Sequence, residues 1–164
     1  ILIEWPDSGR QIQIPAVSRL FDREETIDLG GLTARIFWVD SDHTPDCCVV
    51  QLVEEGVVFL GDCLYLNMDR EPWCRTVGRT RRLMETLLAL DARWYVPAHH
   101  GVCSGEEFAD FARQMLLLAQ AAEGAETAAQ AQERLSALTG HAPTEEERTG
   151  LEEFLAARER GEEK

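Results

Sequence analysis

The stretch that decides the fold is Val57-Val-Phe-Leu-Gly-Asp-Cys-Leu64. Its first half is a short run of β-branched, aromatic and aliphatic residues, which is typical of a buried strand. Gly61 and Asp62 follow directly, and this dipeptide favours a turn at the end of the strand. The sequence therefore predicts a strand over residues 57–61, with the carboxylate of Asp62 projecting from the edge of a sheet.

The residues on the N-terminal side of this stretch also indicate strands. Residues 47–54 are apolar, and the short connection Glu54-Glu-Gly56 predicts a hairpin with residues 57–61. These runs barely alternate between apolar and polar residues, so we expect both faces of the strands to be covered, as in a layered structure. The same reasoning predicts strands at residues 1–5, 11–14, 32–39 and 93–96. We expect residues 1–62 to form most of a mixed sheet.

Beyond residue 77 the leucines recur at the spacing of one helix face, which indicates a change from strands to helices. Ser104 with Glu107, and Thr144 with Glu147, have the spacing of a capping box and predict two helix starts. The expected helices cover residues 76–91, 105–122, 125–138 and 144–160.

Composition limits the class of protein and its partners. A chain of 164 residues with 45% hydrophobic residues suits one globular domain. The formal net charge of −14 disfavours nucleic acid and anionic membrane surfaces as partners. No apolar run is long enough to predict a transmembrane helix, and the N-terminus shows no signal-peptide pattern.

The cysteines indicate the compartment. Their number, five, is odd, and no two have the Cys-x-x-Cys spacing of a redox or zinc motif. Cys47 and Cys48 are neighbours in a predicted strand and would point to opposite faces, which disfavours a bond between them. We therefore expect reduced thiols, no intrachain disulfide and a cytoplasmic protein.

Three histidine or aspartate residues each follow a predicted strand. His43 lies in Asp42-His-Thr-Pro-Asp46, a loop that Thr44 and Pro45 make rigid. Asp62 follows the strand 57–61, and His99 lies in Pro97-Ala-His-His-Gly101. Strand ends are rigid and adjoin open loops, so metal ligands are often placed there. Taken singly, each residue also has a structural interpretation, as a loop histidine or an ordinary turn aspartate.

Two further residues, His100 and Cys63, lie next to candidate metal ligands. His100 follows His99 directly, and at most one of the pair would face a given metal. Cys63 follows Asp62, and although a thiolate is a strong zinc ligand, we favour a small buried residue at this position.

The order of these motifs resembles the second half of the metallo-β-lactamase fold superfamily. Asp42-His-Thr-Pro resembles the family's His-Thr-Pro loop, Phe59-Leu-Gly-Asp its Gly-Asp motif, and Pro97-Ala-His its Pro-Gly-His motif. The resemblance implies that His43 binds a first metal, that Asp62 bridges two metals, and that His99 binds the second. It implies one or two Zn²⁺ ions, with iron or manganese not excluded.

The same resemblance implies an α+β fold, a metallo-β-lactamase-like helix–sheet–sheet–helix sandwich that is represented mainly by its C-terminal half. Residues 1–105 would form the metal-site sheet region, and residues 106–164 would form the C-terminal helices of the same domain. The family's first motif, His-x-His-x-Asp-His, does not occur in the 164 residues. We therefore expect the C-terminal part of a longer protein, or a naturally shortened relative.

The expected function is part of a zinc-dependent hydrolase that activates water against a carbonyl-type, small-molecule substrate. Thioesters, lactones, β-lactams and phosphoesters all remain open as substrates. One alternative is an inactive remnant that serves as a binding or oligomerisation module. In either case the sheet that would close the sandwich is expected to be absent, which exposes an apolar face and favours a homo-oligomer. Another is a non-hydrolytic iron oxidoreductase on the same scaffold, since His and Asp ligands do not identify the metal.

Overall fold

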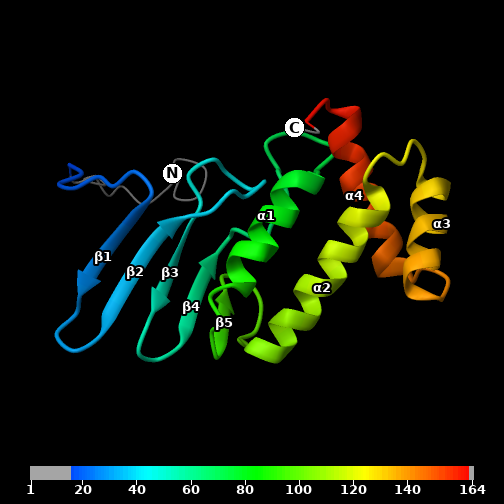
Figure 1. The fold of residues 1–164 in the computed structure, drawn as a ribbon. Coiled ribbons are helices and arrows are strands. Elements are labelled where there is room, and N and C mark those ends of the chain that lie inside the picture. Colours follow the sequence, from blue (N-terminus) through cyan, green and yellow to red (C-terminus); the bar gives the residue numbers. More distant parts are fainter. Residues whose placement is uncertain (1–15, 163–164) are drawn as a thin grey trace, which may run out of the picture.

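The computed structural model describes residues 16–162, and these are built around one sheet of six strands that lie in sequence order (Figure 1). The strands are β1 Glu24–Asp28, β2 Thr33–Trp38, β3 Cys48–Leu52, β4 Val57–Gly61, β5 Trp94–Pro97 and β6 Cys103–Ser104. Neighbouring strands are antiparallel except for β4 and β5, which are parallel. The sheet is therefore mixed, as expected.

The sequence located four of these strands and missed two. β2, β3, β4 and β5 lie within a few residues of the predicted ranges. β1 was not predicted, because Glu24, Thr26 and Asp28 give it the polar character of an exposed edge strand. β6 has two residues, too few for a pattern. The strands predicted at residues 1–5 and 11–14 lie outside the described residues.

Four helices follow the predicted ranges closely. They are α1 Val77–Leu88, α2 Gly105–Ala122, α3 Ala128–Thr139 and α4 Glu145–Glu159. Both predicted capping boxes are present, at Ser104 with Glu107 and at Thr144 with Glu147. α3 begins later than expected, because Thr127 caps it by accepting a hydrogen bond from the Gln130 N–H.

The core lies between the helices and one face of the sheet. Val49, Val58 and Leu60 are fully buried there, in one cluster with Leu87 of α1 and Phe108 of α2. Strand alternation places their neighbours on the opposite face. On that face Phe59 is 42% exposed and Trp94 is 43% exposed. The expectation of two covered faces is therefore wrong for residues 16–162, where the helices pack on one face.

The α+β class is confirmed, with a mixed sheet and a helical layer. Figure 1 shows α3 and α4 beyond α2, at the side of the molecule away from β1. No helix in the described part of the chain combines the length and the apolar character that a bilayer span requires.

Candidate metal centre

The sheet topology brings the three predicted site residues to one edge. β2 and β4 are each antiparallel to β3 and so run in the same direction, and β5 runs parallel to β4. The C-terminal ends of these three strands therefore meet at the same edge of the sheet. His43 follows β2, Asp62 follows β4 and His99 follows β5.

Both imidazoles face the carboxylate of Asp62. The Nε2 atom of His43 lies 3.9 Å from Asp62 Oδ2, and the Nε2 atom of His99 lies 3.4 Å from Asp62 Oδ1. Each ring is thus directed at a different oxygen of one carboxylate. The structure brings the three residues together in this way, with Asp62 in the central position.

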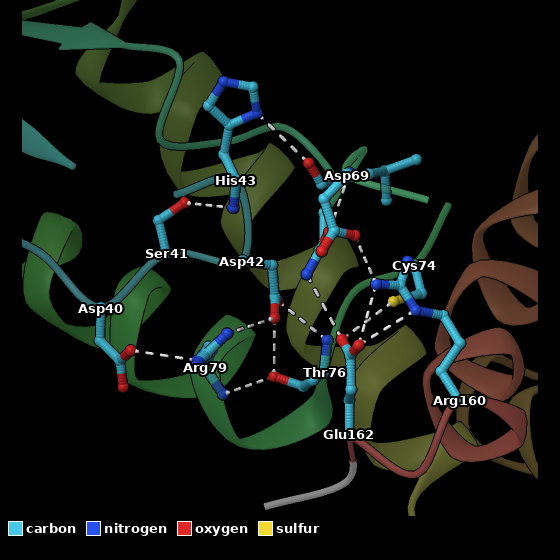
Figure 2. A network of polar contacts seen from close by, with 12 residues as sticks. Asp40, Ser41, Asp42, His43, Asp69, Cys74, Thr76, Arg79, Arg160 and Glu162 are labelled. Atoms are coloured by element: carbon cyan, nitrogen blue, oxygen red, sulfur yellow. Dashed lines mark hydrogen bonds and ion pairs between the residues drawn. The ribbon is translucent and has the colours of Figure 1, made fainter. Parts of the chain in front are cut away.

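The backbone around His43 orients its ring. His43 Nδ1 lies 3.3 Å from the carbonyl oxygen of Leu66, which can only accept, so Nδ1 carries the proton. The His43 N–H donates to Ser41 Oγ at 3.0 Å, and the Ser41 hydroxyl donates to the carbonyl of Cys63 at 2.8 Å. Figure 2 shows the Ser41 hydroxyl beside the backbone nitrogen of His43. The loop after β2 is therefore fastened to the loop after β4.

This orientation has a consequence for the atoms that face Asp62. With the proton on Nδ1, a neutral His43 directs the lone pair of Nε2 towards a carboxylate oxygen. Two acceptors in this arrangement attract each other only through a proton or a cation between them. Asp62 Oδ1 is moreover a buried atom that has no hydrogen-bond partner. A buried oxygen without a hydrogen bond lowers the stability of the fold unless a donor or a cation interacts with it.

The donor chemistry fits a cation, but the described set is incomplete. For metal–ligand bonds of about 2.1 Å, neighbouring ligands of a tetrahedral zinc ion are separated by about 3.4 Å. The distance from His99 Nε2 to Asp62 Oδ1 is 3.4 Å. Among residues 16–162, however, no group of three or more His, Cys, Asp or Glu side chains is arranged so that it could hold a metal ion. These residues fit as a partial ligand set.

Tyr65 is a site residue that the sequence did not reveal. Its hydroxyl is buried and has no hydrogen-bond partner. Its ring centroid lies 6.0 Å from that of His43, 5.6 Å from that of His99 and 5.8 Å from that of His100. The spacing Asp62-Cys-Leu-Tyr65 in one loop was the only available signal. An unpartnered phenol among three imidazoles can donate a hydrogen bond to a ligand.

His100 and Cys63 lie apart from the Asp62 carboxylate in different ways. His100 is exposed and contacts the ring of Tyr65. Cys63 is 1% exposed, and burial raises the pKa of its thiol to about 12. A thiol that stays protonated is a poor metal ligand, so the environment of Cys63 agrees with the interpretation as a small buried residue.

The residue before His43 connects the site to α1. Asp42 is buried and accepts hydrogen bonds from the Thr76 N–H at 2.8 Å and the Thr76 hydroxyl at 3.0 Å. Arg79 lies 3.5 Å from Asp42 and 3.3 Å from Asp40 (Figure 2). Burial raises the pKa of Asp42, and the hydrogen bonds from Thr76 oppose this effect. The carboxylate thus caps the start of α1 from a distant loop.

A second polar network anchors the segment that follows the site, residues 66–74, to the end of α4. The guanidinium of Arg160 donates to the carbonyl of Arg70 at 2.8 Å and to that of Pro72 at 3.2 Å. It also pairs with Asp69 at 2.6 Å and with Glu162 at 2.9 Å (Figure 2). The Arg160 side chain is only 4% exposed. This network fixes the position of the segment that includes Leu66, whose carbonyl oxygen contacts His43 Nδ1.

The likeness to solved structures is partial. A metallo-β-lactamase family protein from Thermus thermophilus is 26% identical, with a TM-score of 0.43, and the match covers 90% of this chain and 51% of that one. A metallo-β-lactamase from Pontibacter korlensis is 18% identical, with a TM-score of 0.47, covering 72% and 54%. The rubredoxin oxygen:oxidoreductase of Desulfovibrio gigas is 14% identical, with a TM-score of 0.42, covering 72% and 45%.

Two of these structures are metallo-β-lactamase-type proteins, the kind whose motifs the sequence resembles. The chain spans about half the length of these proteins or less. No protein-family model and no curated protein matches the chain. Because these three TM-scores are below 0.5, any functional assignment depends on the chain's own site.

Proposed function

We propose that this chain carries part of a metal-dependent hydrolytic site, with His43, Asp62 and His99 as metal ligands. The observation that carries the proposal is the pair of imidazole nitrogens directed at the two oxygens of Asp62, one of which is buried and accepts no hydrogen bond. Zinc is the proposed ion, as one or two ions, and iron or manganese are the alternatives. Imidazole and carboxylate ligands suit all three metals.

The chain's own residues have distinct roles in this proposal. His43 keeps its proton on Nδ1 through Leu66, so Nε2 stays free as a ligand atom. Asp62 offers one oxygen to each side of the site. The Tyr65 hydroxyl donates its proton in a hydrogen bond to the substrate oxygen on which negative charge develops. A bound zinc ion would supply an acidified water and further stabilisation of that oxygen.

The proposed substrate is a small molecule with a carbonyl-type reacting centre, such as an ester, thioester or lactam. The described residues lack a three-donor group, so further donors must join His43, Asp62 and His99 in a complete site. We therefore expect the isolated 164-residue chain to bind zinc weakly and to show no appreciable turnover.

A second function, a binding or oligomerisation module without catalysis, is favoured by two observations. Residues 16–162 contain no group of three metal-binding side chains, and one face of their sheet leaves apolar side chains exposed. In that case Asp62 would have no role in metal binding, which makes the two functions separable by experiment.

Zinc titration calorimetry on the wild-type chain and on Asp62→Asn tests the proposal. Asn keeps the shape of the side chain and removes its charge, so we expect zinc affinity to fall at least about tenfold. His141→Ala is the matched control, because His141 lies exposed in the loop before α4. Equal zinc affinity in the wild type and Asp62→Asn would contradict the ligand assignment and favour the non-catalytic module.

Ester, thioester and β-lactam turnover is measured on the same samples. Strong turnover by the wild-type chain that Asp62→Asn abolishes would show that these residues complete a site without further donors. The expectation of an incomplete site would then be wrong, while the hydrolytic function would stand.

A further inference from the structure

A cavity of about 440 Å³ opens beside the candidate metal centre. Its wall is largely apolar, with Leu64 from the loop after β4, Pro97 at the end of β5, and Phe108 and Phe111 of α2. Small-molecule sites are usually concave, mostly apolar and of this size, with a few polar groups at one end.

The cavity and the metal centre share a wall. Gly61, which lines the cavity, directly precedes Asp62. Tyr65 also lines the cavity, and its ring contacts those of His43 and His99. A molecule with its polar group at Asp62 can therefore extend past Tyr65 into the apolar space.

The charges around the cavity restrict what it accepts. Glu107 and Glu146 line it, and hydrogen bonds from the backbone and hydroxyl of Ser104 lower the pKa of Glu107, so Glu107 is ionised at neutral pH. The one cationic residue of the lining, Arg75, pairs with Glu153 at 2.8 Å. A neutral group avoids the repulsion that a carboxylate would meet from the two glutamates.

We propose that this cavity binds the uncharged, apolar arm of a small molecule whose polar group lies at Asp62. As a substrate subsite, the proposal depends on the proposed hydrolytic function, and it selects acyl substrates with a neutral hydrocarbon arm. As a binding site, it depends only on the cavity. The experiment separates the two.

The test is an NMR titration of the metal-free 164-residue chain, observed at the methyl groups of Leu64. The probes are acetamide, butanamide and hexanamide, with hexanoate as an anionic counterpart of the longest amide. Each buried methylene should raise the affinity about fourfold, so hexanamide binds most tightly. Hexanoate should bind several-fold more weakly than hexanamide, because Glu107 and Glu146 repel it.

Two variants locate the binding. Phe111 is 38% exposed, so we expect Phe111→Ala to keep the fold, and it should weaken hexanamide binding about tenfold. Val102→Ala is the matched control, because Val102 is 60% exposed in the same region and does not line the cavity. It should leave the affinity unchanged. Phe111→Leu should restore most of the lost affinity.

The outcomes distinguish the cavity from the metal centre. Amide affinities that do not depend on chain length, or equal effects of Phe111→Ala and Val102→Ala, would overturn the proposal, whether or not the chain binds zinc. Hexanamide binding in the cavity of a chain that binds no zinc would support the cavity and overturn the hydrolytic function. At saturating zinc, the affinity of alkyl hydroxamates should rise about fourfold with each added methylene, as for the amides. Hydroxamate affinities that do not depend on chain length would overturn the proposed connection between the cavity and the metal centre.

Discussion

Neighbouring residues of the loop after β4 have very different environments. Gly61 adopts a positive φ of 54°, which bends the chain sharply where the strand ends. The Asp62 side chain is 42% exposed at the edge of the sheet, whereas Cys63 is 1% exposed in the core. The carboxylate of Asp62 is thereby accessible to solvent and to bound molecules, while the thiol of Cys63 is shielded from water.

The buried thiol of Cys63 makes stability depend on pH in a predictable direction. Burial raises its pKa in the folded protein to about 12, whereas an unfolded cysteine has a pKa of about 8.5. Below about pH 8.5 the thiol is protonated in both states, and its contribution to stability is complete. Above that pH only the unfolded state loses the proton, so stability falls by about 1.4 kcal/mol per pH unit until about pH 12.

Urea denaturation of the wild type and Cys63→Ala at pH 7 and pH 10 measures this effect. Between the two pH values the wild type should lose about 2 kcal/mol more of its unfolding free energy than the variant. Parallel losses in the two proteins would contradict the assigned burial of Cys63. The other cysteines are common to both proteins, so their contributions cancel in the comparison.

At the scale of a helix, α1 depends on a carboxylate from far away in the sequence. Thr76 occupies the N-cap position, and its N–H and hydroxyl both donate to Asp42. Because Asp42 directly precedes His43, the start of α1 and the position of the candidate ligand are mechanically coupled. The helix is therefore part of the support of the candidate metal centre.

Replacing Asp42 tests this coupling. Asp42→Ala should lower the unfolding free energy by about 2 kcal/mol, because two donors at Thr76 lose a buried charged acceptor. Asp40→Ala is the matched control, since Asp40 pairs with Arg79 and Arg82 in a more exposed position. Its cost should stay below about 1 kcal/mol. Zinc affinity should fall only for Asp42→Ala, and equal effects of the two variants would contradict the coupling.

The contrast between two kinds of cap shows what the sequence could predict. The pair of Ser104 and Glu107 lies within one turn, so the sequence displays the capping box directly. Asp42 and Thr76 are 34 residues apart, and no local pattern connects them. The same distinction explains the strands, because apolar runs identified β2 to β5, whereas the exposed, polar β1 left no such signal.

The site was partly predictable for the same reason. His43, Asp62 and His99 each follow a strand that is visible as an apolar run, and strand order then brings them to one edge. Tyr65 was missed because an unpartnered hydroxyl is a property of the folded structure. The role of the three residues as metal ligands stays a prediction.

Across the whole molecule, an apolar row crosses the face of the sheet that the helices leave open. Ile36 pairs with Val50, Val50 with Phe59, and Phe59 with Val96, so these side chains lie side by side on successive strands. Residues of this kind on a sheet face usually pack against another layer. The open face is therefore a site for association.

We predict that the isolated chain self-associates through this row. Phe59→Lys should shift the protein towards monomer in sedimentation velocity at about 50 µM, because burial of an unpaired charge in the interface is strongly unfavourable. Leu138→Lys is the matched control, since Leu138 is also exposed, at 42%, but lies on α3. A monomeric wild type, or an equal shift with Leu138→Lys, would contradict this surface as the interface.

The network around Arg160 also has a consequence for how the protein is made. Neighbouring strands of the sheet follow each other along the chain, so they can pair as they leave the ribosome. The carbonyl of Arg70, by contrast, accepts its hydrogen bond from Arg160, which is synthesised 90 residues later. At about 5–20 residues per second, this interval lasts roughly 5–18 seconds.

During that time the segment that holds the ring of His43 has no anchor at α4. Protease pulses on nascent chains should cleave within residues 67–73 until Arg160 has emerged, and Arg160→Ala should prolong this sensitivity into the completed chain. Protection that precedes the emergence of Arg160 would contradict this order. The candidate metal centre is thus completed late in synthesis, although its proposed ligands are made early.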